Sequence, residues 1–155
     1  MYQDTATWII YAINCAPSDG EITVTITVTD PNDDVAQNTG SIIADNTPPA
    51  LDITRPLPGI FVMDGQRLLP YPYPVIIGQI TIKADANDMG AGVEKVEFYL
   101  DGKLRAVCTE IPYEWIWDEA SIGFFKLKAI AYDNLGFNAT ASVNDVFILN
   151  FDIWD

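Results

Sequence analysis

The sequence feature that most constrains the fold is one short segment that occurs twice at domain spacing. Residues 20–30 read GEITVTITVTD and residues 123–133 read GFFKLKAIAYD, with a glycine, an alternating stretch and an aspartate at matching positions. Repeats at such spacing indicate tandem modules. Many strand-like segments precede the second copy and few precede the first. We therefore expect the last strands of one module and a linker in residues 1–46, followed by a complete module in residues 47–155.

Both copies have the period-two pattern of a strand with one buried and one exposed face. The apolar residues expected to face inward in the first copy are Ile22, Val24, Ile26 and Val28. Those expected to face inward in the second copy are Phe125, Leu127, Ala129 and Ala131. Each copy therefore predicts a strand that needs a second sheet against its apolar face.

The complete module is predicted to be all-β. Its start is marked by the sequence Asn46-Thr47-Pro48-Pro49, because prolines hold a linker extended. A Pro-rich segment, residues 56–74, holds five of the ten prolines and is expected to be an insertion at a sheet edge. The predicted strands and hairpins cover 50–55, 60–69 (turning at Asp64-Gly65), 75–84, 93–100, 103–109, 113–117, 124–132 and 139–149. This number and spacing of strands predict a β-sandwich.

Composition excludes several classes of function. The net charge of −14 makes nucleic acid an improbable partner, because a polyanion would be repelled. The apolar runs are too short to insert into a membrane as a helix. The chain has no histidine to act as a general base and no serine motif for a nucleophile, so we expect no enzyme activity.

Three ordered motifs resemble the bacterial and archaeal Ig-like domain family. They read VEKVEFYLDG at residues 93–102, PYEWIWD at 112–118 and KAIAYDNLG at 128–136. The resemblance implies an immunoglobulin-like β-sandwich repeated in extracellular or cell-surface proteins. It also implies a structural or adhesive module of a larger protein. The alternative that it implies is a carbohydrate-binding accessory module of a secreted polysaccharide-active or proteolytic enzyme.

Acidic side chains suggest a calcium site at one end of this sandwich. Ig topology brings together the loop that holds Asp85 and Asp88 (Asp85-Ala86-Asn87-Asp88), the loop that starts at Asp133-Asn134, and the linker that contains Asp45. Aspartate and asparagine oxygens suit Ca²⁺, which takes six to eight such ligands. The expected ligands are Asp85, Asn87, Asp88 and Asp133. The same residue types also form ordinary turns, so the pattern leaves both interpretations open.

Aromatic residues suggest a possible ligand surface. Tyr113, Trp115 and Trp117 alternate and therefore share one face of a strand. An exposed row could hold a carbohydrate, whereas a buried row would fill the core of the sandwich. Tyr71 and Tyr73 lie between prolines of the insertion and are expected to be exposed and available to a partner.

Three further expectations concern Cys15, Cys108 and Asn138. The cysteines could be two buried thiols or one disulfide that pins the first module to the second. Asn138-Ala139-Thr140 is a possible glycosylation sequon.

The apolar face of residues 6–44 needs a cover. It could come from a protein partner, or from a second copy in a dimer or filament assembled by β-strand complementation. Alternatively, residues 1–44 could fold back on the complete module.

Overall fold

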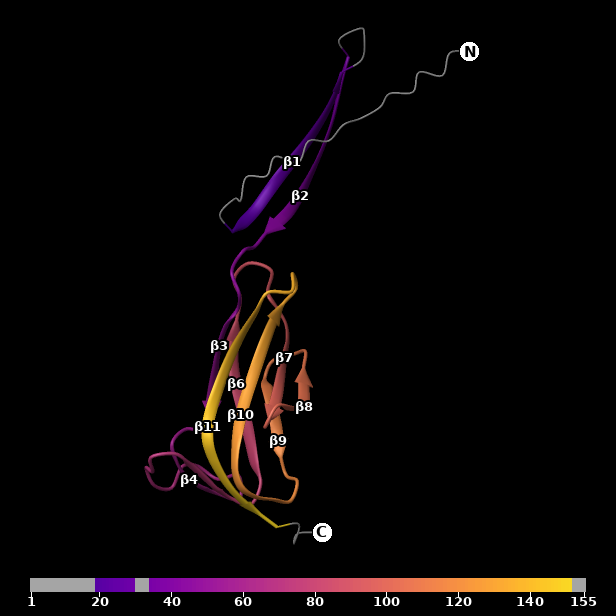
Figure 1. Ribbon diagram of the computed structural model, residues 1–155. Coiled ribbons are helices and arrows are strands. Elements are labelled where there is room, and N and C mark those ends of the chain that lie inside the picture. Colours follow the sequence, from indigo (N-terminus) through magenta and orange to yellow (C-terminus); the bar gives the residue numbers. More distant parts are fainter. Residues whose placement is uncertain (1–18, 30–33, 152–155) are drawn as a thin grey trace.

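A computed structural model describes residues 19–29 and 34–151 of the protein, and this part of the chain is all-β (Figure 1). It contains no helix, and so no helix that could cross a membrane. The strands are β1 (Gly20–Thr29), β2 (Val35–Ala44), β3 (Ala50–Arg55), β4 (Gly59–Val62), β5 (Pro74–Ile77), β6 (Ile80–Asn87), β7 (Val93–Leu100), β8 (Lys103–Cys108), β9 (Tyr113–Trp117), β10 (Ser121–Asp133) and β11 (Asn138–Asn150).

Strands β3 to β11 form a sandwich of two sheets. One sheet has the order β3-β6-β9, and the other has the order β4-β5-β11-β10-β7-β8. Within each strand the apolar residues alternate, so each sheet presents one apolar face to the other. Among the fully buried side chains of this core are those of Ile80, Ile82, Val96, Phe98, Trp117, Leu127, Val146 and Ile148. The expected all-β, immunoglobulin-like sandwich is confirmed.

One expected strand is wrong: residues 75–84 form two strands, not one. Strand β5 belongs to the six-stranded sheet, and β6 belongs to the three-stranded sheet. Gly78 lies between them with φ of 85°, a conformation that residues with a side chain rarely adopt. Its amide donates to the carbonyl of Leu149 at 2.9 Å. The chain therefore changes sheets at Gly78 instead of continuing as one strand.

The Pro-rich insertion lies at the edge of the six-stranded sheet, where β4 is the outermost strand. Strand β4 pairs in parallel with β5, and β5 pairs in parallel with β11. The expected hairpin at 60–69 is reduced to a bridge between Ile60 and Leu69.

Asp64 fixes this insertion to the sandwich. Its carboxylate accepts hydrogen bonds from the backbone amide of Thr81 at 2.7 Å and from the Thr81 hydroxyl at 2.8 Å, and it forms an ion pair with Arg55 at 2.9 Å. Burial opposes ionisation of this carboxyl, but the Thr81 hydrogen bonds and the Arg55 charge outweigh it and lower its pKa.

We expect Asp64→Asn to lower the free energy of unfolding by about 1–3 kcal/mol at neutral pH, because the hydrogen bonds lose their charged acceptor. A carboxyl with a depressed folded pKa stabilises the protein above its unfolded pKa of about 3.9 and loses that contribution as pH falls through the folded value. Urea unfolding of both proteins at neutral pH and near pH 3 should show the difference shrinking in acid. A difference that is the same at both pH values would contradict this role for the charge.

Strands β1 and β2 form a separate two-stranded sheet. They pair in antiparallel register from Gly20 opposite Ala44 to Thr29 opposite Val35. Their hairpin projects from the end of the sandwich where β10 ends and β11 begins, while β11 ends at the opposite end (Figure 1). Strands β1 and β2 thus form an antiparallel hairpin, as β10 and β11 do, but without a facing sheet among the described residues.

Candidate functional site

Three carboxylates from separate segments meet at the end of the sandwich that carries the hairpin. Asp45 lies in the linker after β2, Asp88 follows β6, and Asp133 is the last residue of β10. One carboxylate oxygen from each lies within 4.8 Å of one from each of the others. We call Asp45, Asp88 and Asp133 the carboxylate cluster. Asp45 is only 5% exposed and Asp133 is fully buried.

The loop after β10 holds Asp133 in place. One oxygen, Oδ1, accepts the amides of Leu135 at 2.8 Å and Phe137 at 2.9 Å. The other oxygen, Oδ2, is buried and has no hydrogen-bond partner in the part of the chain that the structure describes. A buried carboxylate oxygen without a donor carries an uncompensated cost of desolvation. Turn formation therefore accounts for only one of the two oxygens of Asp133.

The loop between β6 and β7 brings Asp88 against Asp45. Asp88 Oδ1 accepts the amides of Gly90 and Gly92, both at 2.9 Å. Gly92 has φ of 79°, which favours glycine. A Cβ on Gly90 would lie 2.5 Å from the carboxyl carbon of Asp45, so only glycine lets the loop approach this closely.

Asp45 connects the linker to the sandwich. Its Oδ1 accepts the backbone amide and the hydroxyl of Thr47, both at 3.0 Å, and its Oδ2 accepts the amide of Ala91 at 2.8 Å. The backbone hydrogen bonds from Thr47 and Ala91 lower the pKa of this carboxyl, so it is ionised at neutral pH. Its bond to Ala91 ties the linker to the loop that holds Asp88.

Asp19 joins the other side of the linker to the hairpin. Its carboxylate accepts the backbone amide of Asn46 at 2.7 Å and the Thr47 hydroxyl at 3.0 Å. Thr47 thus contacts carboxylates of both the hairpin and the linker. These hydrogen bonds connect the hairpin to the sandwich through defined contacts, and we call this connection the joint.

The structure separates the four expected metal ligands into two pairs. Asp88 and Asp133 belong to the carboxylate cluster, together with Asp45. Asp85 and Asn87 are exposed residues within β6, opposite Asp52 and Ala50 of β3, and they lie outside the cluster. Both face away from the core because the inward positions of β6 are Ile80, Ile82, Ala84 and Ala86.

The aromatic row of β9 packs into the sandwich. Tyr113 is buried, Trp117 is fully buried, and half-buried Trp115 packs against the core. Trp117 is stacked with Trp115 at 6.1 Å and has Phe125 edge-on at 5.2 Å. Trp117 therefore has no surface to offer a ligand, and β9 does not present an exposed aromatic platform.

Tyr71 is exposed beside the six-stranded sheet as expected, whereas Tyr73 is half-buried because its ring packs between those of Tyr71 and Phe124. Their rings form a series with Phe124 and Phe147, with neighbouring centroids 4.9, 5.5 and 5.1 Å apart. Successive rings are inclined by 87°, 64° and 61°. Because the rings do not share a plane, they do not make a flat surface for a sugar ring.

The remaining predicted residues are separated from this site. Cys108 is half-buried, with its sulfur 3.3 Å from the carbonyl oxygen of Glu114, and Cys15 lies outside the described residues. The disulfide between them stays a prediction. Asn138 is exposed at the start of β11.

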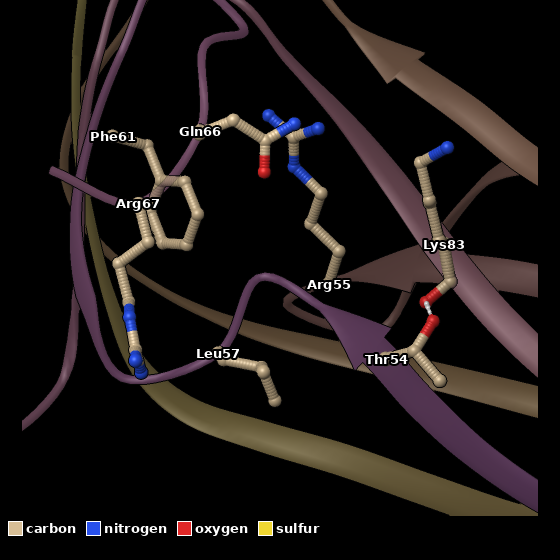
Figure 2. A pocket seen from close by; sticks show the side chains of 7 residues that line it. All are labelled: Thr54, Arg55, Leu57, Phe61, Gln66, Arg67 and Lys83. Atoms are coloured by element: carbon tan, nitrogen blue, oxygen red, sulfur yellow. Dashed lines mark hydrogen bonds between the residues drawn. The ribbon is translucent and has the colours of Figure 1, made fainter.

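A cavity of about 540 Å³ lies between β3, the insertion and β6. Figure 2 shows its lining residues, which include three basic side chains, Arg55, Arg67 and Lys83. Arg55 is paired with Asp64, and Lys83 is paired with Glu114 at 2.7 Å. Its lining residues include no serine, cysteine, histidine or carboxylate for catalysis.

Comparison with known proteins places the fold in a family. A model of the bacterial Ig domain family matches residues 49–129, more than half of the chain. Among solved structures, the chain is similar to fibronectin(III)-like modules of Clostridium thermocellum CbhA, with 18% identity and a TM-score of 0.54. That match covers 90% of this chain and 67% of the CbhA chain. No protein of curated function matches the chain.

Proposed function

Because the chain belongs to the bacterial Ig domain family, we propose that it is a non-enzymatic structural or adhesive module of a larger extracellular or cell-surface protein. Such Ig-like modules are typically non-catalytic and commonly extracellular. The observation that supports this proposal is the position of the hairpin β1–β2. It repeats β10–β11 and joins the sandwich at one end, while β11 ends at the other. Consecutive modules can then be joined end to end.

The hairpin has an apolar face that resembles the covered face of β10–β11. Ile22 lies opposite Ile42, and Val24 and Ile26 follow on the same side of β1. Ile26 is 51% exposed in the described structure, whereas Leu127, Ala129 and Ala131 of β10 are fully buried. At about 25 cal/mol per Å², burial of even a few hundred Å² of this face would contribute several kcal/mol. The greater exposure of the apolar face of β1 compared with that of β10 therefore supports assembly through a sheet that covers the hairpin.

We assign this cover to a second copy of the chain, whose apolar face packs on this one in a dimer, while β-strand complementation at the open strand edges would extend the assembly into a filament. Each copy carries the same apolar face, so two copies can cover each other. The charge opposes this contact, because residues 1–54 hold eight acidic residues and no basic ones. Salt screens such repulsion, so association should strengthen with ionic strength.

Sedimentation velocity of the chain tests this assembly. We expect the weight-average sedimentation coefficient to rise with concentration and with salt, because both favour contact between the apolar faces. Ile26→Thr should weaken the association, because it places a hydroxyl on that face. Leu104→Thr, at an exposed residue of β8, is the matched control and should leave it unchanged. A monomer at every concentration would rule out assembly of this chain and leave the fold-back of residues 1–44.

The alternative is a carbohydrate-binding accessory module of a secreted polysaccharide-active or proteolytic enzyme. Its candidate surface is the aromatic series that begins at Tyr71, since Trp117 is buried. The inclination of the rings in that series favours the structural module. Glycan-array binding that is lost in Tyr71→Ala would favour the accessory module instead.

A further inference from the structure

We infer that the carboxylate cluster of Asp45, Asp88 and Asp133 binds one Ca²⁺ ion. The inference rests on the proposed function only in assigning a use to that ion, which is to stiffen the joint between the hairpin and the sandwich. The ligand set differs from the one that the sequence predicts. Asp45 replaces Asp85 and Asn87, because it belongs to the cluster and they do not.

Two separate observations point to a cation. The first is convergence, since one oxygen from each carboxylate lies within 4.8 Å of the others. Ca²⁺ binds oxygen at about 2.3–2.6 Å, so any two of its ligands are at most about 4.6–5.2 Å apart, and three oxygens within 4.8 Å of one another can share one ion. Mg²⁺ usually keeps several waters and binds through one or two carboxylates, whereas Ca²⁺ takes more oxygens from the protein. Three convergent carboxylates therefore favour calcium.

The second observation is the unpartnered oxygen of Asp133. This side chain is fully buried, and its Oδ2 accepts no hydrogen bond from the described residues. The four ion pairs of the described chain join Arg55, Lys83, Lys95 and Arg105 to other acids, so none of them neutralises the cluster. A buried carboxylate beside two others, with no basic side chain paired to it, is accounted for by a bound cation.

The surrounding backbone leaves the cluster able to bind. Amides of Thr47, Gly90, Ala91, Leu135 and Phe137 hold the three carboxylates in position. Asp133 Oδ2 accepts no hydrogen bond from the described residues, and Asp45 Oδ2 accepts only the amide of Ala91, so both keep lone pairs that can coordinate a metal. Asp88 Oδ1 already accepts two amides, which leaves Oδ2 as the oxygen of Asp88 that would coordinate. Water can supply the remaining ligands, as it does at many calcium sites. Because Asp45 belongs to the linker, Asp88 to the loop after β6 and Asp133 to β10, one ion would join three segments at the joint.

Equilibrium dialysis with ⁴⁵Ca²⁺ and thermal melting of the whole chain test this inference. We expect one Ca²⁺ per chain, and a melting temperature that is higher in millimolar Ca²⁺ than in EDTA, because a ligand of the native state stabilises it. The same concentration of Mg²⁺ should raise it less. Absence of Ca²⁺ binding, or an equal response to Mg²⁺, would overturn the assignment.

Variants distinguish Ca²⁺ binding at the carboxylate cluster from non-specific Ca²⁺ binding to other acidic residues. Asp88→Asn and Asp133→Asn are expected to abolish both the bound Ca²⁺ and the calcium-dependent shift in melting temperature, while asparagine preserves the shape of each side chain. Asp85→Asn is the matched control, because Asp85 is an acid of the same DxND motif outside the cluster, and it should keep both. If Asp133→Asn fails to fold, Asp88→Asn alone decides. Binding that survives in Asp88→Asn, or is lost in Asp85→Asn, would contradict this ligand set.

Sedimentation in EDTA measures assembly of the chain without calcium. Failure of the calcium proposal therefore does not imply failure of the assembly proposal, and the reverse also holds.

Discussion

A chain in which Trp117 is replaced by alanine is expected to lose about 3–5 kcal/mol of its free energy of unfolding. Trp117 is fully buried between the sheets, where it contacts Trp115 and Phe125. Its indole nitrogen also donates to the hydroxyl of Ser121 at 3.2 Å. Domains of this kind are stable by only about 5–15 kcal/mol, so this single loss would remove a large share of the stability.

Ile116→Ala is the matched control for this experiment. Ile116 is the neighbour of Trp117 in β9 but points outward and is 53% exposed. Its replacement should cost about 1 kcal/mol or less. Chemical denaturation measured by tryptophan fluorescence and, for comparison, by circular dichroism gives both values. Equal losses in the two variants would show that Trp117 does not occupy the core.

A second large effect is expected in amide hydrogen exchange. In dilute solution, where the chain is a monomer, amides of β1 should exchange faster than amides of β10 by roughly three orders of magnitude or more. A two-stranded sheet alone is marginally stable in water, whereas β10 pairs with both β7 and β11 inside the sandwich. Exchange of β10 therefore requires global unfolding, and exchange of β1 requires only local opening.

The two copies of the repeat make this comparison internally controlled. Strands β1 and β10 share the alternating pattern and the glycine near the start of the strand, but among the described residues only β10 has a facing sheet. Association is expected to slow the exchange of β1 while leaving β10 unchanged. Mass spectrometry of peptides from the two strands at low and high concentration measures both. Equal protection of β1 and β10 in the dilute monomer would show that the hairpin is already covered.

Alternation of apolar and polar residues predicts most of this fold. Strands β3, β7 and β9 begin and end where the sequence predicts, because the prolines and the Asp101-Gly102 turn mark their limits. Alternation cannot show that residues 75–84 divide between two sheets. That change depends on the conformation of Gly78 and on its hydrogen bond to Leu149, which lies far along the chain.

The candidate site could be predicted in part. Ig topology brings Asp45, Asp88 and Asp133 to one end of the sandwich, and the structure places them in one cluster. Asp85 and Asn87 could have been set aside from the sequence. Alternation with Ile80 and Ile82 already places them on the outward face of β6.

Other features of the site could not be predicted from sequence. The close approach of Gly90 to Asp45 and the complete burial of Asp133 depend on how three separate segments meet. The sequence also does not show why positions 90 and 92 are glycines. A glycine in a loop indicates a turn, but it does not indicate which residues that turn contacts.

We expect the apolar face of β1–β2 to bind the same face of a second copy of the chain. Isotope-filtered nuclear Overhauser spectra of mixed labelled and unlabelled chains test this contact, because they report contacts between copies only. The methyl groups of Ile22, Val24 and Ile26 should contact the other copy at concentrations where the chain associates. If these methyl groups contact only their own chain's sandwich, the hairpin is covered within one molecule and the proposed assembly is wrong.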